Sequence, residues 1–326
     1  MLIRLRAASG AALVSAVLAV EAFAAAPATY PARPIRMIVA QTAGGNADII
    51  ARAFAAGLGE RLGQTVVVDN RGGGSGIIGT ELAARAPADG YTVLLVPSSF
   101  GVNPAAFRKL PYDQLRELAP ITLLSRAPNV LVVGPALQIK SVQDLVQAAR
   151  ANPGKLTFGS SGNMGSPHLA GELFKLMAGV DMTHVPFKGA AAAQVDLMAG
   201  RISLSFASLP STLPHMKSGR VRGIAVTTEK RFSLLPELPT VSESGLAGFE
   251  TSAWQGFTLP AATPRAIVAQ LHAASIAVLN QPSMRERLTQ DGAEVVGSSP
   301  DEFWVFVKAQ ISKWTKVVKA AGLSPE

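Results

Sequence analysis

The amino-acid sequence predicts an α/β protein built of two lobes. From Pro34 onward, short apolar runs alternate with amphipathic segments, which is the pattern of strands that alternate with helices. The chain has 326 residues, of which 48% are hydrophobic and 16% are charged. This composition excludes a disordered or collagen-like chain, and the length suits two lobes of roughly 100–200 residues each.

The first residues are expected to form a secretory signal peptide. A short basic start is followed by an apolar run over Ala7–Val20, and Ala22–Ala24 offers a small-x-small cleavage site. A membrane anchor is the alternative, but the run is mostly alanine and is interrupted by Glu21. We therefore expect residues 1–24 to be removed and the rest of the chain to be exported to the periplasm as a soluble protein.

The first lobe is predicted to begin as a β-α-β-α-β series. Apolar runs predict strands and amphipathic stretches predict helices. The expected strands are 35–40, 65–69 and 91–96, and the expected helices are 47–62 and 76–86.

A second α/β series is predicted to begin near Val130. Ser141, three residues before Asp144, and the Ser166-Pro167 pair mark two helix starts. Proline-rich stretches near 120–128 and 239–264 are the expected passages between the lobes. The expected strands are 130–133, 155–159, 182–186, 202–206 and 221–227, and the expected helices are 142–150, 167–178 and 191–199.

The tail of the chain is predicted to be helical. Thr263 is expected to cap the first of its helices, while Ser299 and Glu302 have the spacing of a capping box around the last one. Pro300 suits the first position of that last helix. The expected helices are 264–280, 283–291 and 299–321.

The composition excludes several kinds of chemistry. The chain contains no cysteine, which rules out disulfides, thiolate zinc sites, iron–sulfur clusters and a cysteine nucleophile. Its four histidines show no metal-ligand spacing. The net charge is +8, but the basic residues are spread singly and few aromatic residues accompany them, so we expect no nucleic-acid partner. The sequence therefore predicts neither a metal nor a cofactor.

One glycine motif has the spacing of a dinucleotide fingerprint. Gly74, Gly76 and Gly79 follow an apolar strand in a G-x-G-x-x-G pattern. The acidic residue that such a fingerprint requires is missing, because the next strand ends in Pro97-Ser98-Ser99. A tight turn that opens a helix is sufficient to explain these glycines.

The most informative segment leads from an apolar strand through Gly44-Gly45 into a helix. This geometry exposes the amides of the helix N-terminus, and glycine lets an anion approach the backbone. Asn46 is expected to cap the helix, and Asp48, in its first turn, is expected to shape the loop. A plain strand-to-helix turn is the alternative.

A similar turn follows a strand of the second lobe. Ser160, Ser161 and Asn163, together with neighbouring backbone N–H groups, are suited to grip a carboxylate. Two such loops, one in each lobe, would face each other across a cleft of the kind in which open α/β sheets bind ligands. The alternative is that these residues only cap the following helix.

No catalytic constellation is predicted. A nucleophile elbow around Ser161 would need glycine at the position of Asn163. His168 could pair with Ser160 or Ser161, but its place at the start of a helix favours a role in orienting the loop. A secreted serine hydrolase that uses one of these serines with His168 stays as an alternative.

From about Tyr30 to the C-terminus, the chain resembles the exported substrate-binding receptors of tripartite tricarboxylate transporters (TctC/Bug-like proteins). Many short blocks occur in the order typical of that family. They include Tyr30-Pro31-Ala32-Arg33-Pro34, Gly44-Gly45 with Asp48, Val68-Asp69-Asn70-Arg71, Asp89-Gly90-Tyr91, Leu110-Pro111-Tyr112-Asp113, Gly159-Ser160-Ser161-Gly162, His168-Leu169-Ala170, His184-Val185-Pro186-Phe187-Lys188-Gly189 and Leu238-Pro239-Thr240.

The resemblance implies a type II periplasmic-binding fold with its ligand cleft between the lobes. Lobe 1 would comprise residues 25–126 and 254–326, and lobe 2 residues 127–253, with hinges near 123–129 and 251–260. Such a receptor is not an enzyme. It is expected to act as a monomer that closes on a small organic anion and delivers it to the large and small subunits of a membrane permease.

The resemblance also implies a set of ligand-binding residues. In that family, the loop after the first strand and the loop after a strand of the second lobe hold one carboxylate, and variable residues contact the rest of the ligand. The corresponding residues are Thr42, Ala43, Gly45, Asn46, Ser98, Ser99, Asn103, Ser160, Ser161, Asn163, His168, Lys188, Gly189, Ala207 and Ser208.

Two departures from the family pattern concern the ligand loops. Thr42-Ala43 stands where a Pro-Pro pair is usual, and Met164 stands where glycine is common. The methionine is expected to narrow the pocket or to favour an apolar ligand body. Dicarboxylates, tricarboxylates, aromatic acids and amino acids all stay open as ligands, and a ligand sensor for a membrane kinase stays as an alternative to transport.

Overall fold

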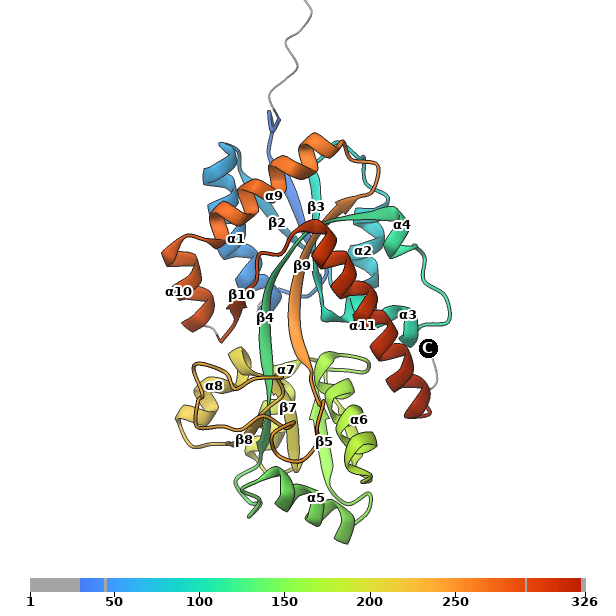
Figure 1. Ribbon diagram of the computed structural model, residues 1–326, viewed down its shortest axis with the longest axis vertical. Helices are drawn as coiled ribbons and strands as arrows, with labels where there is room; N and C mark the ends of the chain where they lie inside the picture. The colour runs from blue at the N-terminus through green and yellow to red at the C-terminus, as the bar shows by residue number, and fades with distance from the viewer. Residues whose placement is uncertain (1–29, 44–45, 291, 324–326) are drawn as a thin grey trace, which may run out of the picture. The chain divides into compact units, whose positions relative to one another are not determined.

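The computed structural model describes residues 30–43, 46–290 and 292–323 (Figure 1). The chain divides into two units after Tyr30, and every element described below belongs to the unit that begins at Pro31. The predicted signal peptide, residues 1–24, lies outside the described residues.

Three parallel strands form the first part of the sheet. β1 (Ile35–Val39) lies between β2 (Val66–Asn70) and β3 (Thr92–Pro97). Helices α1 (Asn46–Leu62) and α2 (Ile77–Ala84) pack against these strands. Most residues of β1 and β3 are fully buried as a result, which explains their nearly continuous apolar sequences.

The second part of the sheet repeats this arrangement. β5 (Thr157–Ser160) lies between β6 (Thr183–Pro186) and β7 (Leu204–Ser208), parallel to both. The core of this part includes Phe174 and Phe206, whose ring centroids are 5.5 Å apart. The remaining elements are α5 (Val142–Ala151), α6 (Ser166–Ala178), α7 (Ala190–Met198), α8 (Leu209–Lys217) and β8 (Arg222–Val226).

Two long antiparallel strands join the two parts. β4 (Leu118–Val133) pairs with β9 (Ser252–Pro260) over residues 118–128 and with β7 over residues 129–133. Figure 1 shows β4 and β9 side by side between the two parts. The strand order is β2-β1-β3-β9-β4-β7-β5-β6, so β9 and β4 are the central strands of one continuous sheet.

The sequence-based expectation for these joining strands is partly wrong. β4 begins at Leu118 rather than at Val130, and β9 lies in a stretch for which no strand is expected from the sequence. The prolines of β4 argue against a strand in the sequence, because proline lacks the backbone N–H that donates hydrogen bonds to a neighbouring strand. The strand tolerates Pro120 through a register irregularity between Pro120 and Thr122.

The C-terminal elements are α9 (Arg265–Leu279), α10 (Pro282–Gln290), β10 (Glu294–Val295) and α11 (Pro300–Ala320). The predicted capping box of α11 is confirmed: the Glu302 backbone N–H donates to Ser299 Oγ at 3.3 Å, and the Ser299 N–H donates to the Glu302 carboxylate at 2.8 Å. The predicted cap of α9 is wrong. Pro264 occupies the cap position, and the Thr263 hydroxyl donates to the Pro260 carbonyl at 2.7 Å instead.

Several short elements are absent from the sequence-based assignment. They include the 3₁₀ turns η1 (Gly74–Gly76) and η2 (Ser98–Gly101), and the single-turn helices α3 (Asn103–Ala106) and α4 (Gln114–Glu117). The nine-residue helix α8 is absent from the assignment as well. Elements of three or four residues are too short to show hydrophobic periodicity. η1 confirms that the glycine motif opens a helix, because α2 begins directly after it.

Helix α11 connects the two parts on one side of the sheet. It contacts β4 and α3 as well as α6 of the second part. A buried hydrophobic cluster at this place contains Val102 and Ala106, Met164 and Leu169, and Trp314 of α11. The architecture is the two-lobed type II fold. Within the described residues, no helix is long and apolar enough to cross a membrane.

Candidate functional site

The ends of β1, β2 and β3 converge on one region of the first lobe. Gly76 has φ +88°, and a Cβ atom there would lie 3.0 Å from the Ala40 carbonyl oxygen and 3.6 Å from Ser99 Oγ. The Ser99 hydroxyl donates to the Ser75 carbonyl at 2.7 Å, and the Asn103 amide donates to the same oxygen at 3.3 Å. The glycine turn therefore lies against the segment that contains two predicted ligand residues.

Asp48 is connected through two side chains to the end of β1. Its buried carboxylate lies 3.0 Å from Arg52 Nε, and the Arg52 guanidinium donates to Asn70 Oδ1 at 3.2 Å. The Asn70 amide in turn donates to the Gln41 carbonyl at 3.3 Å. This chain of contacts ties α1 to the residue that precedes Thr42, which is compatible with a loop-shaping role for Asp48.

The first predicted loop is described only in part. Thr42 and Ala43 are exposed at the end of β1, and α1 begins at Asn46. Gly44 and Gly45 lie outside the described residues, and so does the side chain of Asn46. The predicted contact of Gly45 with ligand stays a prediction.

The second predicted loop follows β5 and begins with a buried serine. Ser160 is 1% exposed, and its hydroxyl donates to the Gly162 carbonyl at 2.8 Å. Its Oγ also lies 2.7 Å from His184 Nε2 and accepts the Gly162 N–H at 3.3 Å. Ser161 and Asn163, by contrast, are exposed. The loop therefore presents two polar side chains to solvent while Ser160 holds its base.

His168 fixes the other end of this loop. Its Nδ1 accepts the Met164 backbone N–H at 3.0 Å, and its Nε2 lies 3.8 Å from the Glu172 carboxylate. The Met164 backbone has φ +55°, a left-handed conformation that favours glycine. This conformation explains why glycine is common at this position: a methionine here carries backbone strain that a glycine would not.

The Met164 side chain is buried rather than directed at a ligand. It is 5% exposed and belongs to the cluster with Val102 and Trp314. This burial does not support the expectation that Met164 narrows the pocket or selects an apolar ligand body, which stays a prediction. Val102 separates Ser99 from Asn103, so the cluster brings the second loop against the segment that carries the predicted residues of the first lobe.

Burial keeps both histidines of this region neutral. Removal of the ring from water, together with the neighbouring His184 and Lys175, lowers the pKa of His168 to about 3. Burial, and to a smaller extent Lys175, lower the pKa of His184 to about 4. At neutral pH, each ring therefore has one protonated and one unprotonated nitrogen.

His184 is the residue of this site that sequence reasoning missed. His184 lies within the short strand expected over 182–186, and nothing in the local sequence distinguishes it from an ordinary strand residue. The role of His184 becomes visible only when β5 is paired with β6. In that pairing His184 is opposite Phe158, and Phe158 is two residues before Ser160. That pairing depends on contacts between distant segments, and no local pattern carries it.

The structure does not show the pairing of serine with His168 on which the alternative, a serine hydrolase, depends. The hydroxyl of Ser160 is paired with His184, while Nδ1 of His168 is taken by a backbone N–H. With the Ser160 hydroxyl donating to the Gly162 carbonyl, His184 faces an oxygen lone pair instead of a proton to remove. In the described residues, no group of three His, Asp or Glu side chains could hold a metal ion either.

The remaining predicted residues lie just before α7 and at the end of β7. Lys188 is exposed, and Gly189, with φ +102°, precedes α7. Ala207 is buried at the end of β7, and Ser208 lies opposite Asn129 of β4. Within the described part of the chain, neither Ser208 Oγ nor Asn129 Oδ1 has a hydrogen-bond partner.

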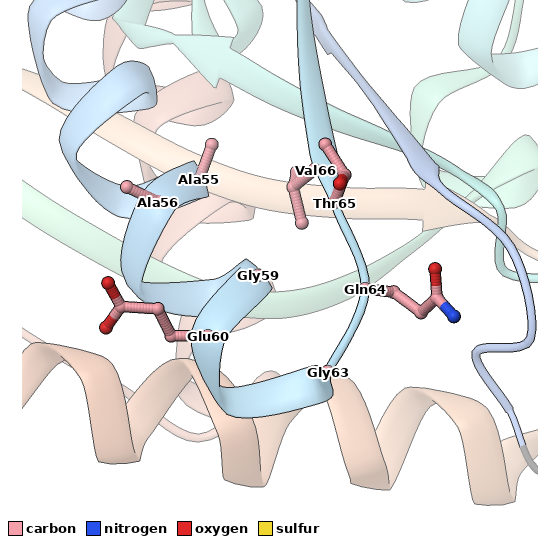
Figure 2. Close-up of a pocket in the computed structure, with 8 residues that line it drawn as sticks. All are labelled: Ala55, Ala56, Gly59, Glu60, Gly63, Gln64, Thr65 and Val66. Carbon is pink, nitrogen blue, oxygen red and sulfur yellow. The ribbon is translucent and has the colours of Figure 1, made fainter.

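A surface hollow occurs at a different place. It lies where α1 approaches the start of β2, and Figure 2 shows its lining. Its residues are Ala55, Ala56, Gly59, Glu60, Gly63, Gln64, Thr65 and Val66. None of them is a predicted ligand residue, and one acidic side chain is a poor match for an anionic ligand.

The type II fold and the polar loops at strand ends in both lobes define a solute-binding receptor. A family model described as the tripartite tricarboxylate transporter family receptor matches residues 50–323. The chain belongs to this family, as the resemblance indicates.

Individual relatives match nearly the whole chain. Protein BugT of Bordetella pertussis is 36% identical over 296 residues, which cover 90% of this chain and 91% of that protein. The structure of R. palustris Rpa4515 with adipate is 39% identical, with a TM-score of 0.85, and covers 91% of this chain and 100% of its own. MatC from Rhodopseudomonas palustris with bound malate is 29% identical, with a TM-score of 0.80, and covers 89% of this chain and 100% of its own.

Proposed function

We propose that this protein is a periplasmic receptor that binds a small dicarboxylate and delivers it to a tripartite tricarboxylate-type permease. The observation that carries the proposal is the similarity, over nine-tenths of the chain, to R. palustris Rpa4515 with adipate. The second similar structure, MatC, holds malate. Adipate and malate differ in length and in hydroxylation but share two carboxylates, and that shared chemistry defines the proposed ligand class.

The polar loops supply the donors that one carboxylate needs. Ser161 and Asn163 are exposed on the second loop. Ser99 and Asn103 donate to the Ser75 carbonyl and so hold in place the segment that packs against this loop. Hydroxyl, amide and backbone N–H donors bind a carboxylate without a buried cationic partner. Lys188, exposed before α7, is the proposed charge at the rim of the site.

The second carboxylate needs donors further along the sheet. Ser208 Oγ lacks a hydrogen-bond partner among the described residues and lies at the junction of β7 and β4. A hydroxyl in this state is available to donate to a ligand oxygen. We assign Ser208 to the distal end of the ligand.

Closure of the two lobes would enclose the ligand. The proposed lobes are residues 25–126 with 254–326, and residues 127–253, so their boundaries fall within β4 and β9. Because two adjacent strands link the lobes, a small change in their twist would turn one lobe against the other. Export through the predicted signal peptide would place the receptor in the periplasm, where family members such as BugD act.

The proposal is tested by thermal unfolding of the purified protein in the presence of mono-, di-, tri- and aromatic carboxylates at fixed salt. A ligand present at about 100 times its dissociation constant adds about 2.7 kcal/mol to stability. We expect a selective rise of several degrees with dicarboxylates. An equal response to all anions, or none, would contradict the assigned ligand class.

A pair of charge variants locates the site. Asn163→Asp places a negative charge on the second loop and is expected to weaken dicarboxylate binding about tenfold or more. Gln138→Glu makes the same chemical change in an exposed loop before α5 and is expected to leave binding unchanged. Equal effects of the two variants would show that general charge, and not the loop, controls affinity.

A further inference from the structure

Two neighbouring strands bring a histidine beside the second loop. Because β5 and β6 are parallel with Phe158 opposite His184, the two side chains lie on one face of the sheet. Ser160, two residues after Phe158, shares that face. His168 reaches the same place from the first turn of α6.

The three rings form one stack, in which Phe158 and His168 are buried and His184 is partly buried. The centroids of His168 and His184 are 3.8 Å apart, with 17° between the ring planes. Phe158 lies 5.0 Å from His184 and 6.2 Å from His168. Gly171 of α6 leaves room for the phenyl ring, because a Cβ atom there would lie 2.3 Å from Phe158 Cε2. Each imidazole is therefore held in one orientation by its neighbours.

The hydrogen bonds assign one tautomer to each ring. His168 Nδ1 accepts the Met164 N–H, so its proton must be on Nε2, which faces the Glu172 carboxylate. The Ser160 hydroxyl lies 2.8 Å from the Gly162 carbonyl and 2.7 Å from His184 Nε2. With the hydroxyl donating to the carbonyl, His184 Nε2 carries the proton that reaches Ser160 Oγ. His184 is a donor and His168 is an acceptor.

We propose that His168 and His184 are positioning residues that clamp the two ends of the loop Ser160–Met164 in the shape that receives a ligand carboxylate. His184 holds Ser160 at the start, and His168 holds the left-handed backbone of Met164 at the end. Ser161 and Asn163 between them stay exposed. The inference rests on the proposed function for its ligand, while the clamp itself is a property of the free protein.

A role in packing alone makes a different prediction. If the rings only fill space, an apolar side chain would replace either of them without consequence for the loop. If they act through hydrogen bonds, the replacement must keep the donor or the acceptor. Glutamine carries a donor where His184 has Nε2, and asparagine carries an acceptor where His168 has Nδ1.

The test uses two matched pairs, His184→Gln with His184→Leu and His168→Asn with His168→Leu, and His215→Leu on α8 as the control. Amide hydrogen exchange of residues 160–165 is measured in the unliganded protein, and the dissociation constant for adipate by titration calorimetry. We expect both leucine variants to exchange faster in the loop and to bind adipate about tenfold more weakly. The glutamine, asparagine and control variants should stay within about threefold of the wild type.

Two results would overturn the inference. The first is loop exchange in the leucine variants that matches the wild type. The second is equal disruption in all four variants, which would show that the retained donor and acceptor do not hold the loop. If the wild type binds no dicarboxylate, the proposed function fails, but the exchange measurement still decides the clamp. Nitrogen NMR of the wild type gives a further check, because protonated Nδ1 in His168 would contradict the assigned tautomer.

Discussion

The two stacked histidines give the protein a pH-dependent stability of known sign. In the unfolded chain, both rings have the ordinary pKa of about 6.5, whereas in the fold their pKa values are about 3 and about 4. Between pH 6.5 and 4, the unfolded state therefore binds protons that the folded state does not. The part of the stability that depends on the two neutral histidines is fully present above about pH 6.5 and is lost as the pH falls.

We predict a steep decline in the free energy of unfolding between pH 6.5 and 5. Each histidine contributes a slope of about 1.4 kcal/mol per pH unit once its unfolded form is protonated. The carboxyl groups with lowered pKa values, among them Asp69 and Glu243, act at lower pH because their ordinary values are 3.8 and 4.5. Urea unfolding at several pH values measures the slope. A flat profile, or one unchanged in the His168→Asn/His184→Gln double variant, would contradict the assignment.

Met164 combines backbone strain with buried packing, and substitution by glycine separates the two. Met164→Gly relieves a left-handed backbone, which stabilises by about 1 kcal/mol. It also removes a side chain buried against Val102 and Trp314, which destabilises by about 2–5 kcal/mol. We therefore expect a net loss of about 1–4 kcal/mol in urea unfolding. A more stable glycine variant would show that strain dominates.

At the residue scale, the sequence identified the second loop but not the residue that supports it. Ser160, Ser161 and Asn163 were predictable because strand-end loops before helices have a local signature. His184 was not, since its role depends on the register between β5 and β6. His168 was assigned to loop orientation for a local reason, its place at a helix start, and the structure adds the bond to Met164.

Among the elements, α6 depends on one glycine for its approach to β5. Helix propensity alone predicts that Gly171→Ala stabilises the protein by about 1 kcal/mol. The added Cβ would lie 2.3 Å from a buried phenyl ring, so we expect a loss of about 1–3 kcal/mol instead. The melting temperature of the Gly171→Ala variant decides between stabilisation and destabilisation. Phe158→Leu in the same background should recover part of the loss, and no recovery would place the clash elsewhere.

The long strands show where local patterns fail at this scale. Most helices and the parallel strands were predictable within a few residues, because both have clear periodicity. β4 and β9 were not, because prolines and polar residues interrupt them and because their stability comes from pairing with each other. Ser125 and Gln255, both buried and opposite each other in this pair, are polar residues that a local reading assigns to loops.

For the whole molecule, the two-lobed α/β architecture was predictable from the alternation of elements, whereas the packing of the second loop against a distant segment was not. The cluster of Val102, Met164 and Trp314 joins three segments that are far apart in the chain. It brings the second loop to the Ser98–Asn103 segment. Only the fold supplies this proximity.

The central claim is that the two loops recognise a carboxylate without performing chemistry on it. The most direct test is calorimetric titration of the purified protein with adipate and with its dimethyl ester, followed by chemical analysis of the recovered compounds. We predict that adipate binds at one molecule per chain and is recovered unchanged, and that the neutral ester neither binds nor is hydrolysed. Equal binding of the ester, or its conversion to acid and methanol, would contradict the account.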